Sequence, residues 1–284
     1  MKNKGLILLA TLLVFGGCNK AATDSIKIAN RGVRAFYNRD YAHAEHMFKV
    51  AIQVYPKNAM AHYHLGLIYL YHKDQPKLAV KELKAAIQYN DTLGPAYYHL
   101  GRALLTLGDK DGAVKYLSKA VKLMPKEPGP LFWMGKALEE KGDYNGADDF
   151  YRKAILMDPT YSRAFIALSD LYVKAGAYPE AIKVLKEDLR INKNDYNGYE
   201  RLGHLYMSLG EFKKAVNMYI MALNLHPQNP LYYLNLAAGY VGMQKYDRAA
   251  HFLRLFVLQA KGNAAKYIPA AKAMYSKVVE LASQ

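Results

Sequence analysis

Small and bulky apolar positions recur along the chain with a fixed period. The clearest series is a set of alanines that stand 34 residues apart at every step except the first, which is 35: Ala44, Ala79, Ala113, Ala147, Ala181, Ala215 and Ala249. A bulky apolar residue follows each alanine after four positions: Phe48, Leu83, Leu117, Tyr151, Leu185, Tyr219 and Leu253. Because positions i and i+4 share one face of an α-helix, the pattern predicts a helix in each unit that buries this face.

Another helix is predicted upstream of this one in every unit. Most units carry a glycine in this register, twelve or thirteen residues before the alanine: Gly32, Gly66, Gly101, Gly135 and Gly203. Turn signals such as Gly108-Asp109 separate the two helices, and prolines such as Pro125 end the unit because proline cannot continue a helix. Small residues on both helices allow the two backbones to approach closely. Each unit is therefore expected to be a helix–turn–helix.

These Gly, Ala, bulky and Pro positions resemble the tetratricopeptide repeat (TPR) family. The resemblance implies an all-α fold, a right-handed superhelical solenoid of seven helix–turn–helix repeats with a C-terminal capping helix. The repeats span 25–263, divided into 25–58, 59–93, 94–127, 128–161, 162–195, 196–229 and 230–263. The sequence departs from the repeat where Ser169 and Ala237 replace Gly, and where Asp188 and Phe256 replace the second Ala. For Asp188, the sequence leaves open a pairing with Arg201 or a seam opened to water.

The segment 264–284 breaks the period and is predicted to form the cap. Pro269 is placed to begin a last helix, with Met274, Val278 and Leu281 on one face. Repeat arrays need an atypical terminal unit that covers the last exposed face.

The N-terminus has the layout of a secretory signal. Lys2 and Lys4 precede a short apolar run, and Gly16-Gly17 stand directly before Cys18. The run is about half the length that a bilayer crossing needs. The small residues before the cysteine resemble the lipobox of bacterial lipoproteins, although Phe15 stands where Leu is preferred.

This resemblance implies cleavage of a signal peptide, residues 1–17, and lipidation of Cys18, followed by a short linker to residue 24. Several acyl chains would hold the protein stably on a membrane. Asn19, by the sorting pattern of enteric lipoproteins, implies retention at the outer membrane, facing the periplasm. The alternative is a plain secretory signal with an incidental cysteine.

Amino-acid composition and charge limit the classes of protein and of binding partner that remain possible. Of the 284 residues, 22% are charged, too many for an integral membrane bundle, and the single cysteine cannot form an intramolecular disulfide. The formal net charge is +15. Most of the lysines fall on the second helices, which favours a solvated outer face, with anionic lipid or cell-wall polymer as the functional alternative. Secretion argues against nucleic acid as a partner, despite the many tyrosines.

In the resembled family, the first helix of each pair lines a concave face that holds proteins or extended peptides. Carried onto this sequence, that face gives ten candidate binding residues: Val33, Phe36, Tyr63, Leu67, Leu70, Tyr98, Arg102, Leu105, Phe132 and Lys136. The alternative is that these side chains fill the inside of a tight superhelix or meet the N-terminal segment. Ala29 and Val33 replace the first residues of the clamp that holds C-terminal carboxylates in some relatives. That clamp activity is not predicted.

The sequence therefore predicts a non-catalytic interaction scaffold. It resembles multi-TPR lipoproteins that assist type IV pilus and secretin assembly; an adaptor for peptidoglycan enzymes is the alternative, and a glycan-binding protein or enzyme is a third class. No nucleophile motif or paired carboxylates stand out. His43 and His46 share a helical face without further ligands, so neither a metal nor a cofactor is predicted. The partner and the oligomeric state are left open.

Overall fold

The computed structural model describes the backbone of residues 4–283 and the side chains of residues 20–283. The side chains of the predicted signal peptide 1–17 and of Cys18 therefore lie outside the described part. Within it, the chain is all-helical and contains no strand.

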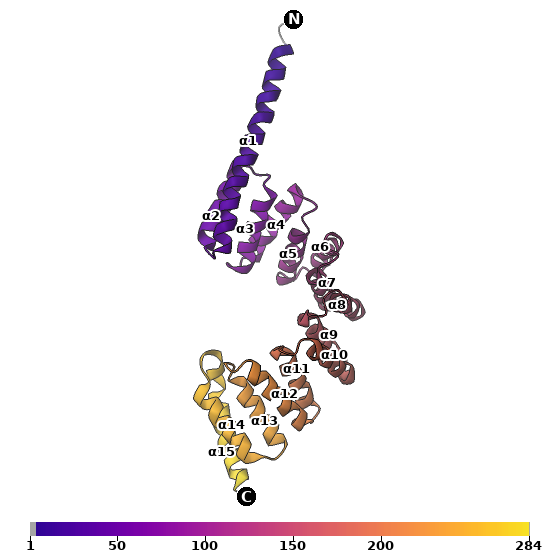
Figure 1. The fold of residues 1–284 in the computed structure, drawn as a ribbon, viewed down its shortest axis with the longest axis vertical. Helices are drawn as coiled ribbons and strands as arrows, with labels where there is room; N and C mark the ends of the chain where they lie inside the picture. Colours follow the sequence, from indigo (N-terminus) through magenta and orange to yellow (C-terminus); the bar gives the residue numbers. More distant parts are fainter. Residues whose placement is uncertain (1–3, 284) are drawn as a thin grey trace. The chain divides into compact units, whose positions relative to one another are not determined.

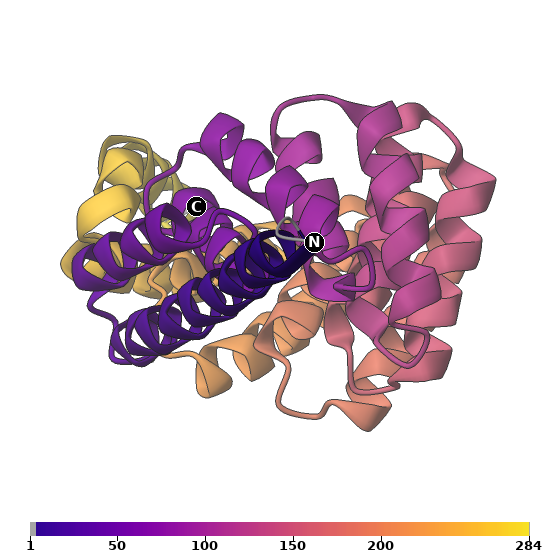
Figure 2. The same ribbon diagram turned by 90° about the horizontal axis from the view of Figure 1, so that it is seen from above.

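The helices follow one another in pairs, with short connections (Figures 1 and 2). The first four pairs are α1 (Lys4–Tyr37) with α2 (Tyr41–Val54), α3 (Ala59–Tyr71) with α4 (Pro76–Tyr89), α5 (Gly94–Thr106) with α6 (Lys110–Leu123), and α7 (Pro128–Lys141) with α8 (Tyr144–Met157). The next three are α9 (Ser162–Lys174) with α10 (Tyr178–Ile191), α11 (Tyr196–Ser208) with α12 (Phe212–Leu225), and α13 (Leu231–Gly242) with α14 (Tyr246–Gln259). A 3₁₀ turn, η1 (Gly262–Tyr267), then leads to α15 (Ile268–Ala282).

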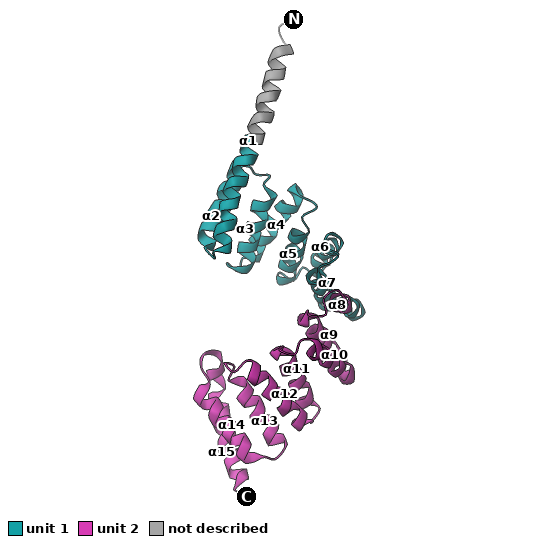
Figure 3. Ribbon diagram, viewed as in Figure 1, with its two compact units in different colours: residues 1–150 teal, residues 151–284 magenta. Residues whose placement is uncertain are grey.

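The chain divides into two compact units, residues 1–150 and 151–284 (Figure 3). The boundary falls inside α8.

The turn inside each helix pair holds one residue in the left-handed region. Four of these turns place a glycine in the left-handed region, with φ between 73° and 87°: Gly108, Gly142, Gly176 and Gly210. At the equivalent positions of the other three pairs, the structure holds Arg39, Asp74 and Gln244 at φ of 63°, 50° and 57°. The left-handed turn is thus kept even where the sequence offers no glycine.

The core of the first unit lies between the paired helices, at the predicted small and bulky positions. Ala44, Ala79 and Ala113 are completely buried, as are the bulky residues four positions later in the same helices. A Cβ added to Gly101 of α5 would lie 2.5 Å from Cγ of Leu117 in α6. The helices of this pair can approach so closely because that position carries no side chain.

The core of the second unit repeats this arrangement and extends into the cap. Leu185, Tyr219 and Leu253 have exposed fractions of 0–1%. Phe256, which replaces the small residue of the repeat, is completely buried in the same cluster as Ala271 and Val278 of α15. The larger ring therefore adds apolar surface for the terminal helix, and the predicted capping helix is confirmed.

A buried polar chain links the first three helices. Ser25 of α1 donates a 2.7 Å hydrogen bond to the carbonyl of Ala51, and the Asn58 side-chain amide donates to Ser25 Oγ at 2.8 Å. Asn58 also caps α3 by accepting from the backbone N–H of Ala61 at 3.0 Å. Satisfied in this way, the buried polar groups fix α1 against α2 and the start of α3.

Among the described residues, no helix has both the length and the apolar character to cross a bilayer.

Candidate functional site

All ten candidate binding residues lie on first helices of the first unit. They are distributed over α1, α3, α5 and α7. Leu67, Leu105 and Phe132 are buried, each about 8% exposed, and the other seven are half-buried. Packing within the unit therefore covers the three buried side chains almost entirely, whereas the remaining seven keep part of their surface accessible.

The N-terminal part of this face is filled by its own aromatic contacts. The Phe36 ring lies 5.6 Å from the Tyr41 ring in an edge-to-face arrangement and 5.7 Å from His64. Val33 and Leu70 pack against the same core. At this end, the side chains pack against one another and against the core of the unit. This agrees with the alternative interpretation of the sequence, in which they fill the inside of the repeat array.

Further along, α3, α5 and α7 bring together a group that we call the aromatic–arginine cluster: Tyr63, Tyr71, Tyr98, His99, Arg102 and Trp133. The Arg102 guanidinium carbon lies 4.3 Å from the Trp133 ring centroid, 5.0 Å from that of Tyr71 and 5.5 Å from that of Tyr98. These are cation–π distances. One cation thus holds three rings from three successive first helices.

His99 sits among the rings of this cluster. Its ring lies 4.6 Å from that of Tyr98, and its Nδ1 is hydrogen-bonded to the Tyr71 hydroxyl at 2.6 Å. Burial lowers the pKa of His99 to about 3, with the Arg102 charge adding to the effect. Burial likewise raises the pKa of Tyr63 to about 12. Near neutral pH, Arg102 therefore carries the charge of the cluster.

Three members of the cluster, Tyr71, His99 and Trp133, were missed by the sequence analysis. His99 directly follows Tyr98, and Trp133 directly follows Phe132. Repeat register assigns Tyr98 and Phe132 to the face, but His99 and Trp133 are the residues that contact the preceding first helix, through Tyr71 and Arg102 respectively. The concentration of Tyr, His and Trp beside the assigned positions was the available signal.

Lys136, the next charged candidate along the face, is already paired. Its Nζ lies 3.1 Å from Oε2 of Glu139, one turn later in α7, whose side chain is buried. Lys136 is therefore tied to its own helix, in contrast to Arg102.

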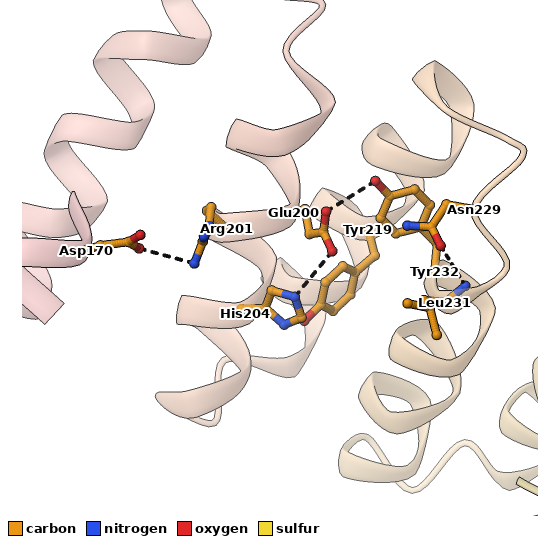
Figure 4. A network of polar contacts seen from close by, with 8 residues as sticks. All are labelled: Asp170, Glu200, Arg201, His204, Tyr219, Asn229, Leu231 and Tyr232. Carbon is orange, nitrogen blue, oxygen red and sulfur yellow. Dashed lines mark hydrogen bonds and ion pairs between the residues drawn. The ribbon is translucent and has the colours of Figure 1, made fainter. Parts of the chain in front are cut away.

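In the second unit, the first helices α9 and α11 enclose a shallow cleft of about 240 Å³. Five of its seven lining residues are polar or charged, and two are apolar: Ser169, Asp170, Val173, Arg201, His204, Leu205 and Ser208. An ion pair joins its two sides, with Arg201 Nη1 3.3 Å from Asp170 Oδ1 (Figure 4).

A polar network adjoins this cleft and ties α11 to α12 and α13 (Figure 4). The Tyr232 hydroxyl donates to Glu200 Oε2 at 3.4 Å, and His204 Nε2 lies 3.6 Å from Glu200 Oε1. His204 Nδ1 is hydrogen-bonded to the Tyr219 hydroxyl at 2.9 Å. The interaction with His204 lowers the pKa of Glu200, against the effect of burial. The network keeps Glu200 ionised beside the cleft.

Both interpretations of Asp188 from sequence are wrong. Arg201 pairs with Asp170 instead, and the Asp188 side chain is completely buried, so the seam is not open to water there. Asp188 Oδ1 accepts a 2.6 Å hydrogen bond from Asn192. Asp188 lies on the second helix α10, and its carboxyl turns into the junction.

In the part of the chain that the structure describes, no group of three or more His, Cys, Asp or Glu side chains lies close enough together to hold a metal ion.

Comparison with protein families matches four stretches of the chain to repeat models. Residues 30–91, 94–127 and 138–203 match models described as tetratricopeptide repeat, and residues 203–244 match a model described as TPR repeat. The chain belongs to the tetratricopeptide repeat family. TPR domains are typically interaction modules without enzymatic activity, and they hold proteins or peptides on the surface formed by their stacked helices.

Solved structures show the same fold. A tetratricopeptide repeat protein from Parabacteroides merdae has a TM-score of 0.64 at 15% identity, with 92% of this chain and 100% of that one covered. PilF from Pseudomonas aeruginosa has a TM-score of 0.58 at 21% identity, with coverage of 75% and 96%. MamA has a TM-score of 0.53 at 26% identity, with coverage of 56% and 92%. Comparison with curated protein sequences gives no match.

These comparisons establish the TPR fold and, with it, a protein–protein interaction scaffold. In this TPR protein, the aromatic–arginine cluster of the first unit and the polar cleft of the second are the first-helix surfaces on which a partner could bind.

Proposed function

We propose that this protein is a lipid-anchored scaffold of the bacterial cell envelope that holds a partner on the aromatic–arginine cluster and assists the assembly of a type IV pilus or secretin complex. The cluster carries the proposal. Trp, Tyr and Arg are the residues most enriched among those that dominate binding energy at protein interfaces. Here they occupy one face, and Tyr71 is 41% exposed, so a partner can reach it.

The envelope part of the proposal rests on the sequence. The basic N-terminus, the short apolar run and Gly16-Gly17-Cys18 together resemble a lipoprotein signal. A lipid anchor on Cys18 would place the repeats close to a membrane, because the linker to residue 24 is short. The pilus or secretin role rests on the resemblance of this layout to multi-TPR lipoproteins; the similarity to PilF supports it through the shared fold.

The test compares two tyrosines of the first unit that are matched in exposure. Tyr71 at the end of α3 is 41% exposed and belongs to the cluster, whereas Tyr89 at the end of α4 is 39% exposed and lies on a second helix. Cells that carry wild-type protein, Tyr71→Ala or Tyr89→Ala are treated with a crosslinker, and the proteins joined to each variant are identified.

We expect a secretin or pilus subunit to be recovered with wild-type protein and with Tyr89→Ala, and its recovery to fall at least about fivefold with Tyr71→Ala. Circular dichroism of each variant establishes that the repeats are folded. Recovery of peptidoglycan synthetic or hydrolytic enzymes in a Tyr71-dependent manner would overturn the pilus role in favour of the adaptor. Equal recovery with both variants would show that the cluster is not the binding face.

A further inference from the structure

Arg102 differs from the other charged residues of the first-helix faces because no carboxylate of the described residues lies within ion-pair distance of it. Lys136 is paired with Glu139, and Arg201 is paired with Asp170. The only hydrogen bond from the Arg102 guanidinium to a described residue is a 3.3 Å bond from Nη1 to the Tyr98 hydroxyl. Its Nε is shielded from solvent and has no acceptor among these residues.

The rings around Arg102 prepare it to bind an anion. A guanidinium has five N–H donors directed along the edges of its plane. Tyr71, Tyr98 and Trp133 lie around it at cation–π distance, and its Nε is shielded from solvent while the residue as a whole is half-buried. The shielded Nε, which lacks an acceptor among the described residues, costs about 1–3 kcal/mol. An incoming acceptor at the accessible part of the guanidinium meets a group that is partly dehydrated and already held in place.

We propose that Arg102 binds the carboxylate of an Asp or Glu side chain in an extended partner segment, with apolar residues beside the acid lying on the rings of the aromatic–arginine cluster. This inference rests on the proposed function and specifies what the partner must contain. A guanidinium and a carboxylate can form two parallel charge-assisted hydrogen bonds, a geometry that lysine does not offer. His99 is neutral and leaves Arg102 as the cation of the cluster.

A defined probe tests this without knowledge of the natural partner. The full chain, purified in detergent, is used to select binders from a displayed library of random twelve-residue peptides. Selected peptides are then synthesised with an amidated C-terminus, so that the terminal carboxylate is absent and only side-chain acids remain. Dissociation constants are measured for each peptide and for its Asp→Asn or Glu→Gln counterpart, on wild-type protein and on Arg102→Gln.

We expect the selected peptides to share an Asp or Glu next to apolar residues. Replacing that acid by its amide weakens binding to wild-type protein at least about tenfold, and this difference disappears on Arg102→Gln. Lys136→Gln is the matched control, because Lys136 occupies the equivalent position of the next first helix and is already paired. Binding to Lys136→Gln retains the preference for the acid.

The possible failures are distinguishable. If peptides lose affinity on Tyr71→Ala but bind equally well with acid or amide, the aromatic face is a binding site and the carboxylate inference is overturned. In that case Arg102 serves to hold α3, α5 and α7 together, and Arg102→Gln lowers thermal stability alone. If Tyr71→Ala weakens the binding of none of the selected peptides, both the carboxylate inference and the proposed binding face are wrong. If binding requires a free C-terminus, a terminal carboxylate is the ligand and the proposal of a side chain is wrong.

Discussion

The side-chain amide of Asn192 donates a 2.6 Å hydrogen bond to Oδ1 of Asp188, while Oδ2 of the same carboxyl is buried without a hydrogen-bond partner among the described residues. The Asp188 side chain is completely buried, at a position where most repeats carry alanine. Burial raises the pKa of Asp188 to about 6, and the neighbouring Asp195 carboxylate adds to the rise while Asn192 opposes it. The ionised carboxyl is therefore poorly solvated in the folded state.

Asp188→Ala is expected to stabilise the protein at neutral pH. Because the folded-state pKa lies above the ordinary value of 3.8, the free energy of unfolding of the wild type falls as pH rises from about 4 to about 6, and then stays level. Removing the carboxyl removes this loss, roughly 2–3 kcal/mol at pH 7.5 and much less at pH 4. Urea unfolding of both proteins at the two pH values measures the difference.

Glu187→Ala provides the control for this change. Glu187 is the preceding residue of α10 and is exposed, so its substitution is expected to alter stability by less than about 0.5 kcal/mol at either pH. If the stability difference between Asp188→Ala and wild type does not change with pH, ionisation of the buried Asp188 carboxyl does not destabilise the folded protein, and the explanation is wrong.

The helix pairs and their core could be predicted from sequence because every repeat needs small residues where its two helices approach each other closely. Ala44, Ala113 and Ala215 are completely buried, as expected of positions where two helices approach closely. A small residue is needed wherever two helix backbones lie close together, and its recurrence at a fixed spacing along the chain reveals these positions in the sequence.

The candidate site could be predicted only in part, because side-chain direction is not contained in repeat register. The sequence assigned Arg102 to the first-helix face but gave no indication that Tyr71 and Trp133 would enclose its guanidinium. In the same way, Asp188 and Arg201 both lie near the α10–α11 junction, and Arg201 reaches Asp170 instead. Which of several charges a long flexible side chain reaches depends on packing between helices.

Gln244→Gly is expected to raise the free energy of unfolding by about 0.5–1 kcal/mol. Gln244 has a φ of 57° in the turn between α13 and α14, where four other repeats place glycine. A side chain in this left-handed conformation brings Cβ close to the backbone, and glycine removes that strain. Thermal unfolding of Gln244→Gly is compared with that of Gln244→Ala, which keeps the Cβ. Equal stability of the two variants would contradict the explanation.

Cys18→Ser is expected to move the protein from the membrane fraction to the soluble fraction of the cell envelope, because the thiol is the proposed point of acylation. Fractionation of cells followed by intact-mass measurement checks both the location and the acyl mass. Asn19→Ser, which keeps the cysteine, serves as the control and should stay with membranes. If wild-type protein is soluble and lacks acyl mass, Gly16-Gly17-Cys18 is only the end of a secretory signal.

Gly101→Ala is expected to destabilise the first unit, although alanine favours a helix over glycine by about 1 kcal/mol. The added Cβ would lie 2.5 Å from Leu117 Cγ, a branched atom near the backbone that cannot turn aside, so α5 and α6 must separate. Such overpacking costs about 1–3 kcal/mol, which leaves a net loss of up to about 2 kcal/mol in chemical unfolding.

Gly129→Ala and a double variant separate the clash from the effect of helix propensity. A Cβ on Gly129 would make only ordinary contacts with the Tyr98 side chain, the nearest being 3.5 Å to its hydroxyl oxygen, so this change is expected to be neutral or slightly stabilising. Leu117→Ala alone opens a cavity and costs about 2–5 kcal/mol. Combined with Gly101→Ala, it removes the atoms that the new methyl group meets, so the two losses should sum to more than the double variant shows. Additive losses would mean that Leu117 is not what keeps position 101 small.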